Sequence, residues 1–214
     1  STASQSQQNQ EGNYWDSFLN LDFIYDKRNQ KFQTTSGFKS FYSLDLPILS
    51  ENNTLKNHYN YSYYFDLFDE NVSSVSLLLK SANSINNKDI KLSERINIPS
   101  SKLRGFESGR IGPKDGGDFI GGNYGFALNF ASTIPKLLEN SQNVDFLFFI
   151  DAASLWGVDY DDTIDDSGSI RSSTGVALDW FSPIGPLNFS LAYPMTKEDG
   201  DKEETFRFNI GTSF

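Results

Sequence analysis

Hydrophobic and polar residues alternate along most of this chain, in segments of about ten residues bounded by Gly, Pro, Asn or Asp. The last segment has one apolar face, which consists of Phe206, Phe208, Ile210 and Phe214. The residues between them form a polar face, which consists of Arg207, Asn209, Gly211 and Ser213. A period of two predicts β-strands, each with one apolar and one polar side.

Nine segments share this pattern. They cover residues 14–26, 37–48, 58–67, 73–85, 123–133, 144–156, 172–182, 186–195 and 204–214. Such a segment has roughly the length that a tilted strand needs to cross the hydrocarbon core of a membrane. Lipid offers no water to backbone groups, so these strands must pair on both edges within a closed sheet. We therefore predict an all-β fold, a transmembrane antiparallel β-barrel.

The connections between the segments predict their orientation. If the last strand ends on the periplasmic side, the periplasmic connections are residues 27–36, 69–72, 134–143 and 183–186. The external connections are then residues 1–12, 49–57, 86–122, 157–171 and 197–202. The two longest loops fall outside and the tightest turns fall inside, which is typical of outer-membrane barrels. The pattern favours the bacterial outer membrane.

Composition narrows the possible functions. The chain is 37% hydrophobic with a mean hydropathy of −0.46, values that a barrel with a polar lumen shares with soluble proteins. Its 15% aromatic content suits lipid-facing rings and aromatic girdles. A net charge of −10 excludes a nucleic-acid partner, because phosphate binding needs surplus Lys and Arg. With no cysteine and only one histidine, His58, we expect no enzyme, cofactor or metal site.

The chain begins at Ser1 without a methionine or a signal peptide, and nine is an odd number of strands. Single-chain bacterial barrels have even numbers of strands, so we expect further strands upstream. Residues 1–214 are then the C-terminal portion of one barrel domain. Within it, the loop at about residues 86–122 is far longer than most loops, and such loops are usually functional.

This long loop contains Leu103, Arg104, Gly105 and Phe106 in succession, then I-G-P at residues 111–113 and G-G-N at residues 121–123. The succession resembles the long lumen-entering loop of the BamA family, the outer-membrane β-barrel assembly factors. Other stretches resemble the same family in the same order. They are D-K-R-N at residues 26–29 with Phe32, Thr34 and Gly37, F-F-I-D at residues 148–151 with Trp156, W-F-S-P-I-G-P-L at residues 180–187, and F-R-F-N-I-G at residues 206–211.

The resemblance covers nearly all of the chain beyond Tyr14 and implies the C-terminal half of the family's sixteen-stranded barrel. It implies assembly and insertion of other outer-membrane β-barrel proteins, with unfolded outer-membrane proteins as clients. It also implies periplasmic or lipoprotein accessory subunits as partners, and a surrounding lipid bilayer. Three alternatives stay open: a polypeptide-secretion translocator of the same superfamily, a passive porin and a soluble β-sandwich adhesin. The translocator shares the R-G-F loop, whereas the W-x-S-P-x-G-P-L turn favours the assembly factor.

An arginine inside a barrel lumen needs a carboxylate partner. Asp151 lies on the same face of its strand as Phe149, so we expect it to point inward and to bind Arg104 in bidentate fashion. Gly105 permits a tight turn beside this pair. Members of the family often carry a second acidic residue at the position of Ala131. Because it is absent here, we expect Arg104 and Asp151 alone to fix the loop.

In the BamA family the last strand is a β-signal, which barrel proteins present to the assembly machine, and one side of a lateral seam where client strands enter. The resemblance gives this role to Phe206, Phe208, Ile210, Gly211 and Phe214. Asn209 and Gly211 weaken the strand, which favours a seam.

Five aspartates crowd one external loop: Asp159, Asp161, Asp162, Asp165 and Asp166. Their spacing does not fit an EF-hand, because Ile164 and Ile170 occupy the positions of its glycine and its bidentate glutamate. We interpret this segment as a solvated acidic loop.

Overall fold

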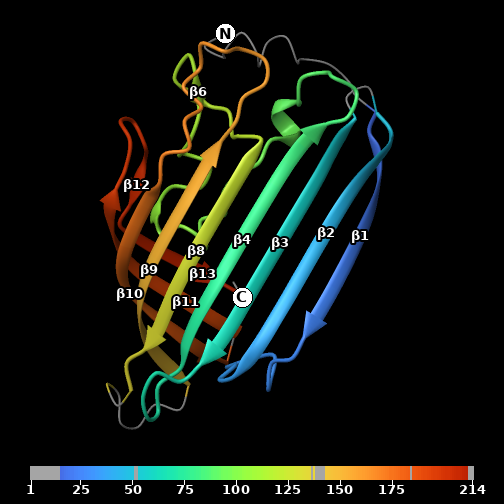
Figure 1. Cartoon of the computed structure of the whole chain (residues 1–214). Coiled ribbons are helices and arrows are strands. Elements are labelled where there is room, and N and C mark those ends of the chain that lie inside the picture. The colour runs from blue at the N-terminus through green and yellow to red at the C-terminus, as the bar shows by residue number, and fades with distance from the viewer. Residues whose placement is uncertain (1–14, 51–52, 136, 138–142, 184, 212–214) are drawn as a thin grey trace.

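In the computed structural model the chain forms one curved antiparallel sheet of nine strands (Figure 1). The structure describes residues 15–50, 53–135, 137, 143–183 and 185–211. The strands of the sheet are β1 (Ser17–Asp26), β2 (Gly37–Leu49), β3 (Thr54–Phe65), β4 (Ser73–Ser84), β8 (Tyr124–Thr133), β9 (Val144–Trp156), β10 (Arg171–Ser182), β11 (Gly185–Thr196) and β13 (Phe206–Ile210). Each pairs with the next along the chain, so the predicted all-β fold and its nine strands are confirmed.

The sheet curves without closing. Strands β11 and β13 pass behind β8 and β4 in Figure 1. Among the described residues β1 and β13 are the two edges of the sheet and do not pair with each other. These nine strands therefore form an open wall of a barrel.

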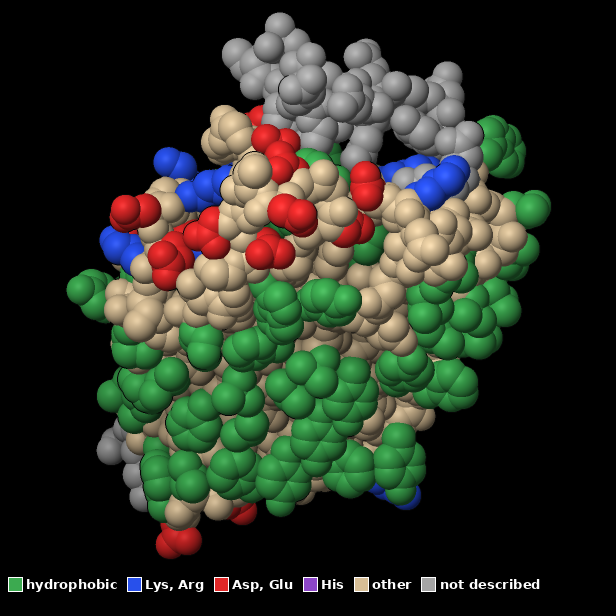
Figure 2. Space-filling view, turned by 45° about the horizontal axis from the view of Figure 1, so that its top comes forward, with side chains coloured by type: hydrophobic (Ala, Val, Ile, Leu, Met, Phe, Trp, Pro, Cys, Tyr) green, Lys and Arg blue, Asp and Glu red, His purple; other side chains and the backbone are tan. Residues whose placement is uncertain are grey.

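The outer face of this wall is apolar. Its exposed side chains include Leu79, Leu128, Ile150, Val176, Leu191 and Phe206. Figure 2 shows a broad band of hydrophobic side chains beneath one end of the molecule, where acidic and basic side chains gather. So much exposed apolar surface is unfavourable in water and favourable in hydrocarbon, so the band suits lipid.

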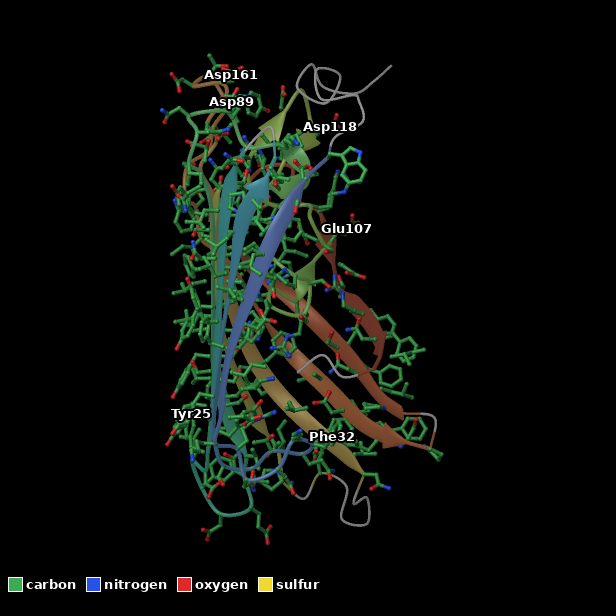
Figure 3. The ribbon with its side chains drawn as sticks, turned by 90° about the vertical axis from the view of Figure 1, so that its right-hand side faces the viewer. Tyr25, Phe32, Asp89, Glu107, Asp118 and Asp161 are labelled. Carbon is green, nitrogen blue, oxygen red and sulfur yellow. The ribbon has the colours of Figure 1, made fainter. Side chains whose placement is uncertain are left out.

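The concave side of the wall is covered by residues 85–123, which connect β4 to β8 and which we call the lumen loop. Its short elements are a 3-10 helix, η1 (Leu92–Glu94), and the strands β5 (Gly105–Phe106), β6 (Lys114–Asp115) and β7 (Asp118–Phe119). Figure 3 shows Glu107 and Asp118 of this loop on the concave side of the sheet. Within the described part of the chain, no helix is long and apolar enough to cross a bilayer.

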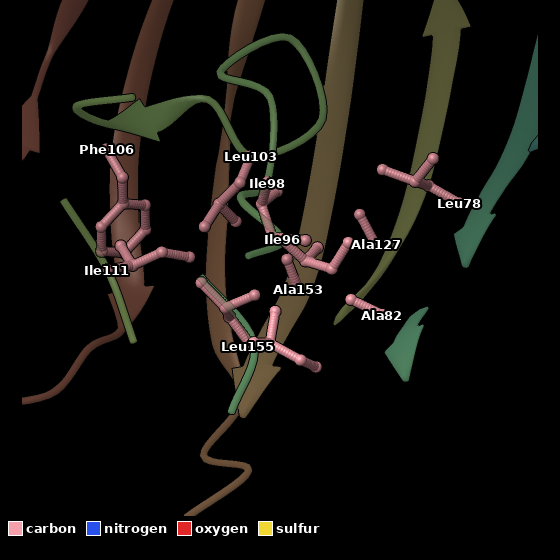
Figure 4. Close-up of a cluster of buried hydrophobic side chains, with 11 residues drawn as sticks. Leu78, Ala82, Ile96, Ile98, Leu103, Phe106, Ile111, Ala127, Ala153 and Leu155 are labelled. Atoms are coloured by element: carbon pink, nitrogen blue, oxygen red, sulfur yellow. The ribbon is translucent and has the colours of Figure 1, made fainter. Parts of the chain in front are cut away.

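The largest buried cluster lies between this loop and the wall (Figure 4). The loop contributes Ile90, Ile96, Ile98, Leu103, Phe106 and Ile111. The wall contributes Leu78, Ala82, Ala127, Ala153 and Leu155. Three of the five wall residues are alanines, which leave room for the loop to approach the sheet closely.

Most strand boundaries lie within three residues of those predicted, and the larger differences are at the start of β3 and in the last strand. Strand β3 begins at Thr54 rather than at residue 58, because Thr54 still pairs with Ser84 of β4. The last predicted strand is divided into β12 (Glu203–Glu204) and β13, with Thr205 between them. The reason is a change of partner, since β12 pairs with β5 of the lumen loop while β13 pairs with β11.

Candidate functional site

The guanidinium and the backbone of Arg104 both bind Asp151, on the inner face of β9. Arg104 Nε donates to Asp151 Oδ2 at 2.7 Å, and Nη2 donates to Oδ1 at 2.7 Å. The backbone N–H of Arg104 donates to Oδ2 at 3.1 Å. The Asp151 side chain is 0% exposed and that of Arg104 is 15% exposed. A buried carboxylate is thus satisfied by three donors from one loop residue, in the bidentate geometry that arginine provides.

A second side chain of the wall completes this contact. Asn129 Nδ2 donates to Asp151 Oδ1 at 2.9 Å and to the carbonyl oxygen of Lys102 at 2.8 Å. The register of β8 and β9 places Asn129 opposite Asp151, and Ala131 opposite Phe149. The position at which relatives often carry a second acidic residue, Ala131, thus lies two residues from Asn129 along β8. Asn129 adds hydrogen bonds without a second negative charge.

Lys102 ties the same part of the loop to β4. Its Nζ donates to Ser76 Oγ at 2.9 Å, and Ser76 Oγ donates to Asn129 Oδ1 at 3.1 Å. Burial lowers the pKa of Lys102, while the negative charge of Asp151 opposes that shift. The network therefore joins the loop to β4, β8 and β9 together.

The aromatic ring of Phe149 packs against the guanidinium of Arg104. The Cζ atom of Arg104 lies 3.5 Å from the centroid of the Phe149 ring, a cation–π contact on a fully buried aromatic. Gly175 faces Phe149 across β9 and β10. A Cβ atom at residue 175 would lie 2.7 Å from Phe149 Cζ and 2.0 Å from the carbonyl oxygen of Leu191. Sequence reasoning missed Gly175, although an isolated glycine in a strand pattern indicates such close approach.

Gly105 brings the loop backbone onto β10 and β11. Its φ is +92°, and a Cβ atom there would lie 3.2 Å from Ser173 Cβ and 3.3 Å from Ala192 Cβ. The residues on either side of the Arg104–Gly105 pair, Leu103 and Phe106, are 2% and 1% exposed within the buried cluster. The motif thus needs a glycine for its turn and also for its contact with the wall.

Phe106 meets the segment that leads into the last strand. In the short pair of β5 and β12, Gly105 lies opposite Glu204 and Phe106 opposite Glu203. Arg207 Nη2 donates to the carbonyl oxygen of Phe106 at 2.9 Å. Sequence reasoning missed this contact. The only indication of it was a charged residue on the polar face of the last strand.

The ion pair of Arg104 and Asp151 does not hold the loop alone, contrary to expectation. Arg95 forms an ion pair with Asp159 and donates to Asn123 Oδ1 at 3.1 Å. Lys91 Nζ lies 3.0 Å from Asp16 Oδ2, at the start of the described chain. The loop is 37 residues by its predicted bounds of 86–122, too long to be ordered from one point, and its apolar side chains supply the rest of its burial.

Most carboxylates of the acidic external loop accept hydrogen bonds from residues of the same loop. Besides Asp159, three of them accept backbone N–H groups: Asp161 from Thr163, Asp165 from Ser167, and Asp166 from Val158. Hydrogen bonds from the hydroxyl and the amide of Thr163 lower the pKa of Asp161, and the amide of Ser167 lowers the pKa of Asp165. Among the residues that the structure describes, no group of three or more His, Cys, Asp or Glu side chains is placed to hold a metal ion.

The apolar face of the last strand points away from the loop. Phe206, Phe208 and Ile210 are 55%, 45% and 69% exposed. Gly211 has a φ of +110°, a conformation that favours glycine. Phe214 lies outside the described residues. Strand β13 therefore presents its aromatic side chains outward while Arg207 points inward.

Known proteins with similar sequences are outer-membrane assembly factors and related proteins. The sequence matches the model of the Omp85 superfamily domain over residues 1–214. The outer membrane protein assembly factor BamA of Neisseria meningitidis serogroup B is 32% identical over 144 residues, 52% of this chain and 17% of that protein. BamA of Neorickettsia risticii is 30% identical over 166 residues, 75% of this chain and 22% of that protein. A SAM50-like protein of Schizosaccharomyces pombe is 31% identical over 150 residues, 66% of this chain and 31% of that protein.

A solved structure agrees with these relatives. The crystal structure of BamA from Haemophilus ducreyi lacking POTRA domains 1–3 is similar with a TM-score of 0.79 and 32% identity, over 88% of this chain and 41% of that one. The chain spans about a fifth of the two BamA relatives, 17% and 22% of their lengths. The predicted resemblance to the BamA family is confirmed. The chain belongs to the Omp85 superfamily, and its nine strands are part of a transmembrane β-barrel of the bacterial outer membrane.

Proposed function

We propose that the protein containing this chain assembles β-barrel proteins and inserts them into the bacterial outer membrane. This chain supplies the C-terminal part of its barrel. Relatives named outer membrane protein assembly factor BamA, and a SAM50-like relative, support a function of this kind at the level of the family. Its clients are unfolded outer-membrane proteins, and its partners are periplasmic or lipoprotein accessory subunits and the bilayer. The activity requires no catalytic residue, nucleotide or cofactor.

The observation that carries the proposal is the docked lumen loop. A diffusion porin needs a water-filled lumen. Here the inner face of β8 and β9 is covered by apolar side chains of the loop, and Asp151 beneath them is fully buried. Such a covered wall obstructs diffusion, and it suits a barrel whose activity lies in its strands and at its edges.

We propose that the loop motif, Leu103 to Phe106, keeps this part of the wall rigid, and that Asp151 is its anchor. If Arg104 moved away, the buried carboxylate of Asp151 would lose its ionic partner or become exposed to solvent. Either change costs free energy. Rigidity here matters because the strands next to the site must hold their shape while a client pairs with them.

Strand β13 is the proposed seam. It pairs with β11 at five positions, whereas β10 and β11 pair at eleven. Among the described residues its other edge has no strand partner. A client strand can add to such an edge by backbone hydrogen bonds, and the outward side chains Phe206, Phe208 and Ile210 would contact lipid as it does so. We include Gly211 and Phe214 in the seam by family resemblance.

The test uses the full-length protein in liposomes. A small outer-membrane β-barrel is unfolded in urea, added to the liposomes, and its folding followed by heat-modifiable mobility on gels. The proposal predicts faster folding than with empty liposomes. Steady ion conductance without faster folding would favour a porin. Passage of the client into the liposome interior, where added protease cannot reach it, would favour a secretion translocator.

A further inference from the structure

The loop motif crosses the inner face of the wall from β9 to β13. Arg104 binds Asp151 on β9, and Gly105 lies against Ser173 on β10 and Ala192 on β11. Phe106 then pairs with Glu203 just before β13. Three consecutive residues thus connect four strands.

Arg207, the second residue of β13, binds the Phe106 end of the loop motif. Its Nη2 donates to the Phe106 carbonyl at 2.9 Å, and its Nε donates to Glu204 Oε2 at 2.9 Å. Arg207 is 9% exposed and the Glu204 side chain is 35% exposed, so the arginine end of the ion pair is the one shielded from water. One guanidinium therefore joins the loop, β12 and β13, a geometry that a planar fork of donors permits.

Backbone contacts continue the same connection outward. The amide of Glu107 donates to the carbonyl of Lys202 at 2.8 Å, and the amide of Lys202 donates to the carbonyl of Arg110 at 3.2 Å. At Thr205 the chain returns to the sheet, where its carbonyl accepts from Ala192 at 2.8 Å. The external end of the last strand is therefore attached to the lumen loop as well as to β11.

We propose that Arg207 is a positioning residue that makes the lumen loop and the external end of the last strand one unit. The proposal rests on the proposed function, in which β13 is the seam. It assigns the loop a second task, to hold the external end of the seam strand. At the opposite end of β13, Ile210 pairs with Leu187 of β11 and its side chain is 69% exposed, and this is the end at which the proposal expects the seam strand to separate first.

The experiment measures hydrogen exchange in the full-length protein in nanodiscs, without a client. Arg207→Ala should speed exchange about tenfold or more both in residues 103–107 and in residues 203–207, because a charge-assisted hydrogen bond is lost between them. The milder Arg207→Gln should show the same pattern with a smaller change, and Arg207→Lys should restore part of the protection. The reverse test is Arg104→Ala, which should speed exchange in residues 203–207, since coupling is reciprocal.

Lys197→Gln is the matched control. Lys197 forms an ion pair with Glu203 in the same hairpin, but its side chain is 55% exposed, and no contact joins it to the described loop motif. It should leave exchange in residues 103–107 unchanged. The proposal is wrong if Arg207→Gln speeds exchange only in the last strand, or if Arg104→Ala leaves residues 203–207 unchanged. Because no client is present, this result is independent of whether the protein inserts clients.

Discussion

The two halves of the wall differ on their inner faces. Beneath the loop motif, on β8–β11, the inward side chains are buried and many of them are small: Ala127, Ala153, Ser173, Ala177 and Ala192. On β1–β3 the inward positions carry polar and charged side chains that are not buried: Asp22, Ser43, Asp45, Lys56 and His58. Strand pairing is antiparallel in both halves, with a register shift between Ser17 and Phe18 in β1.

The difference shows what a docked loop requires of a barrel wall. Alanine, serine and glycine leave room for backbone, and one buried carboxylate gives the loop a fixed point. Long charged side chains would fill the same space and would need water. Loop docking is therefore specified by the wall as much as by the loop, and substitutions in the two halves should have different effects.

The largest effect is expected from Arg104→Ala, which leaves Asp151 buried without its ionic partner. Breaking a buried ion pair costs about 3–5 kcal/mol, and we expect about 3 kcal/mol because Arg104 is 15% exposed. Limited proteolysis should cleave the lumen loop much faster than in the wild type. Unchanged protection would show that the ion pair does not anchor the loop.

A larger side chain on the inner face of β8–β11 should displace the lumen loop even though the loop motif itself is unchanged. Ala153 is 0% exposed within the cluster, so Ala153→Leu should weaken docking by about 1–3 kcal/mol through overpacking. Ser43→Leu on β2 is the matched control, because Ser43 lies on the inner face of β1–β3, outside the buried cluster, and its hydroxyl accepts a hydrogen bond from the exposed Asn20 side chain. Equal loss of loop protection in both variants would contradict the comparison of the two halves.

Gly105→Ala tests the close approach of the motif to β10 and β11. A positive φ disfavours a side chain, and the added Cβ would crowd Ser173 and Ala192 at 3.2 and 3.3 Å. We expect a cost of about 1–2 kcal/mol. Hydrogen exchange of residues 103–107 should rise while that of β3 stays constant. Wild-type exchange in the variant would mean that the turn tolerates a side chain.

The smallest effect is expected at the edge of the loop, where Asp16 meets Lys91. A hydrogen bond from Ser50 lowers the pKa of Asp16, and the nearby Lys91 lowers it further. A carboxylate whose pKa is lowered by folding stabilises the folded state at any pH above the pKa that it has in the unfolded chain. This contribution is lost as the pH falls through the lowered pKa of the folded state. Protection of residues 88–92 should therefore fall below about pH 4. Asp16→Asn should remove that pH dependence, and an unaltered pH profile in this variant would refute the assignment.

The sequence predicted the wall far better than it predicted the contacts of the loop. A period of two is a local property, so all nine strands and the inward direction of Asp151 could be inferred from alternation. Pairing register is not local. For that reason alternation did not identify Asn129, which the register places opposite Asp151.

Contacts between distant segments were predicted least well. Arg207 binds a carbonyl oxygen of Phe106, about a hundred residues away, and any carbonyl can accept such a bond. Nothing in the residue type of Phe106 indicates this partner. The division of the last strand at Thr205 was missed for the same reason, since it depends on pairing with β5 rather than on the strand's own residues.

The most direct test of the account is to measure client folding and loop docking in the same set of full-length proteins. The set is the wild type, Arg104→Ala, Ala153→Leu and Ser43→Leu, each in liposomes with a urea-unfolded barrel client. We predict that the rate of client folding falls in step with loop protection in the first two variants and stays at the wild-type value in Ser43→Leu. Wild-type folding rates in a protein whose loop has lost its protection would contradict the claim that the docked loop supports insertion.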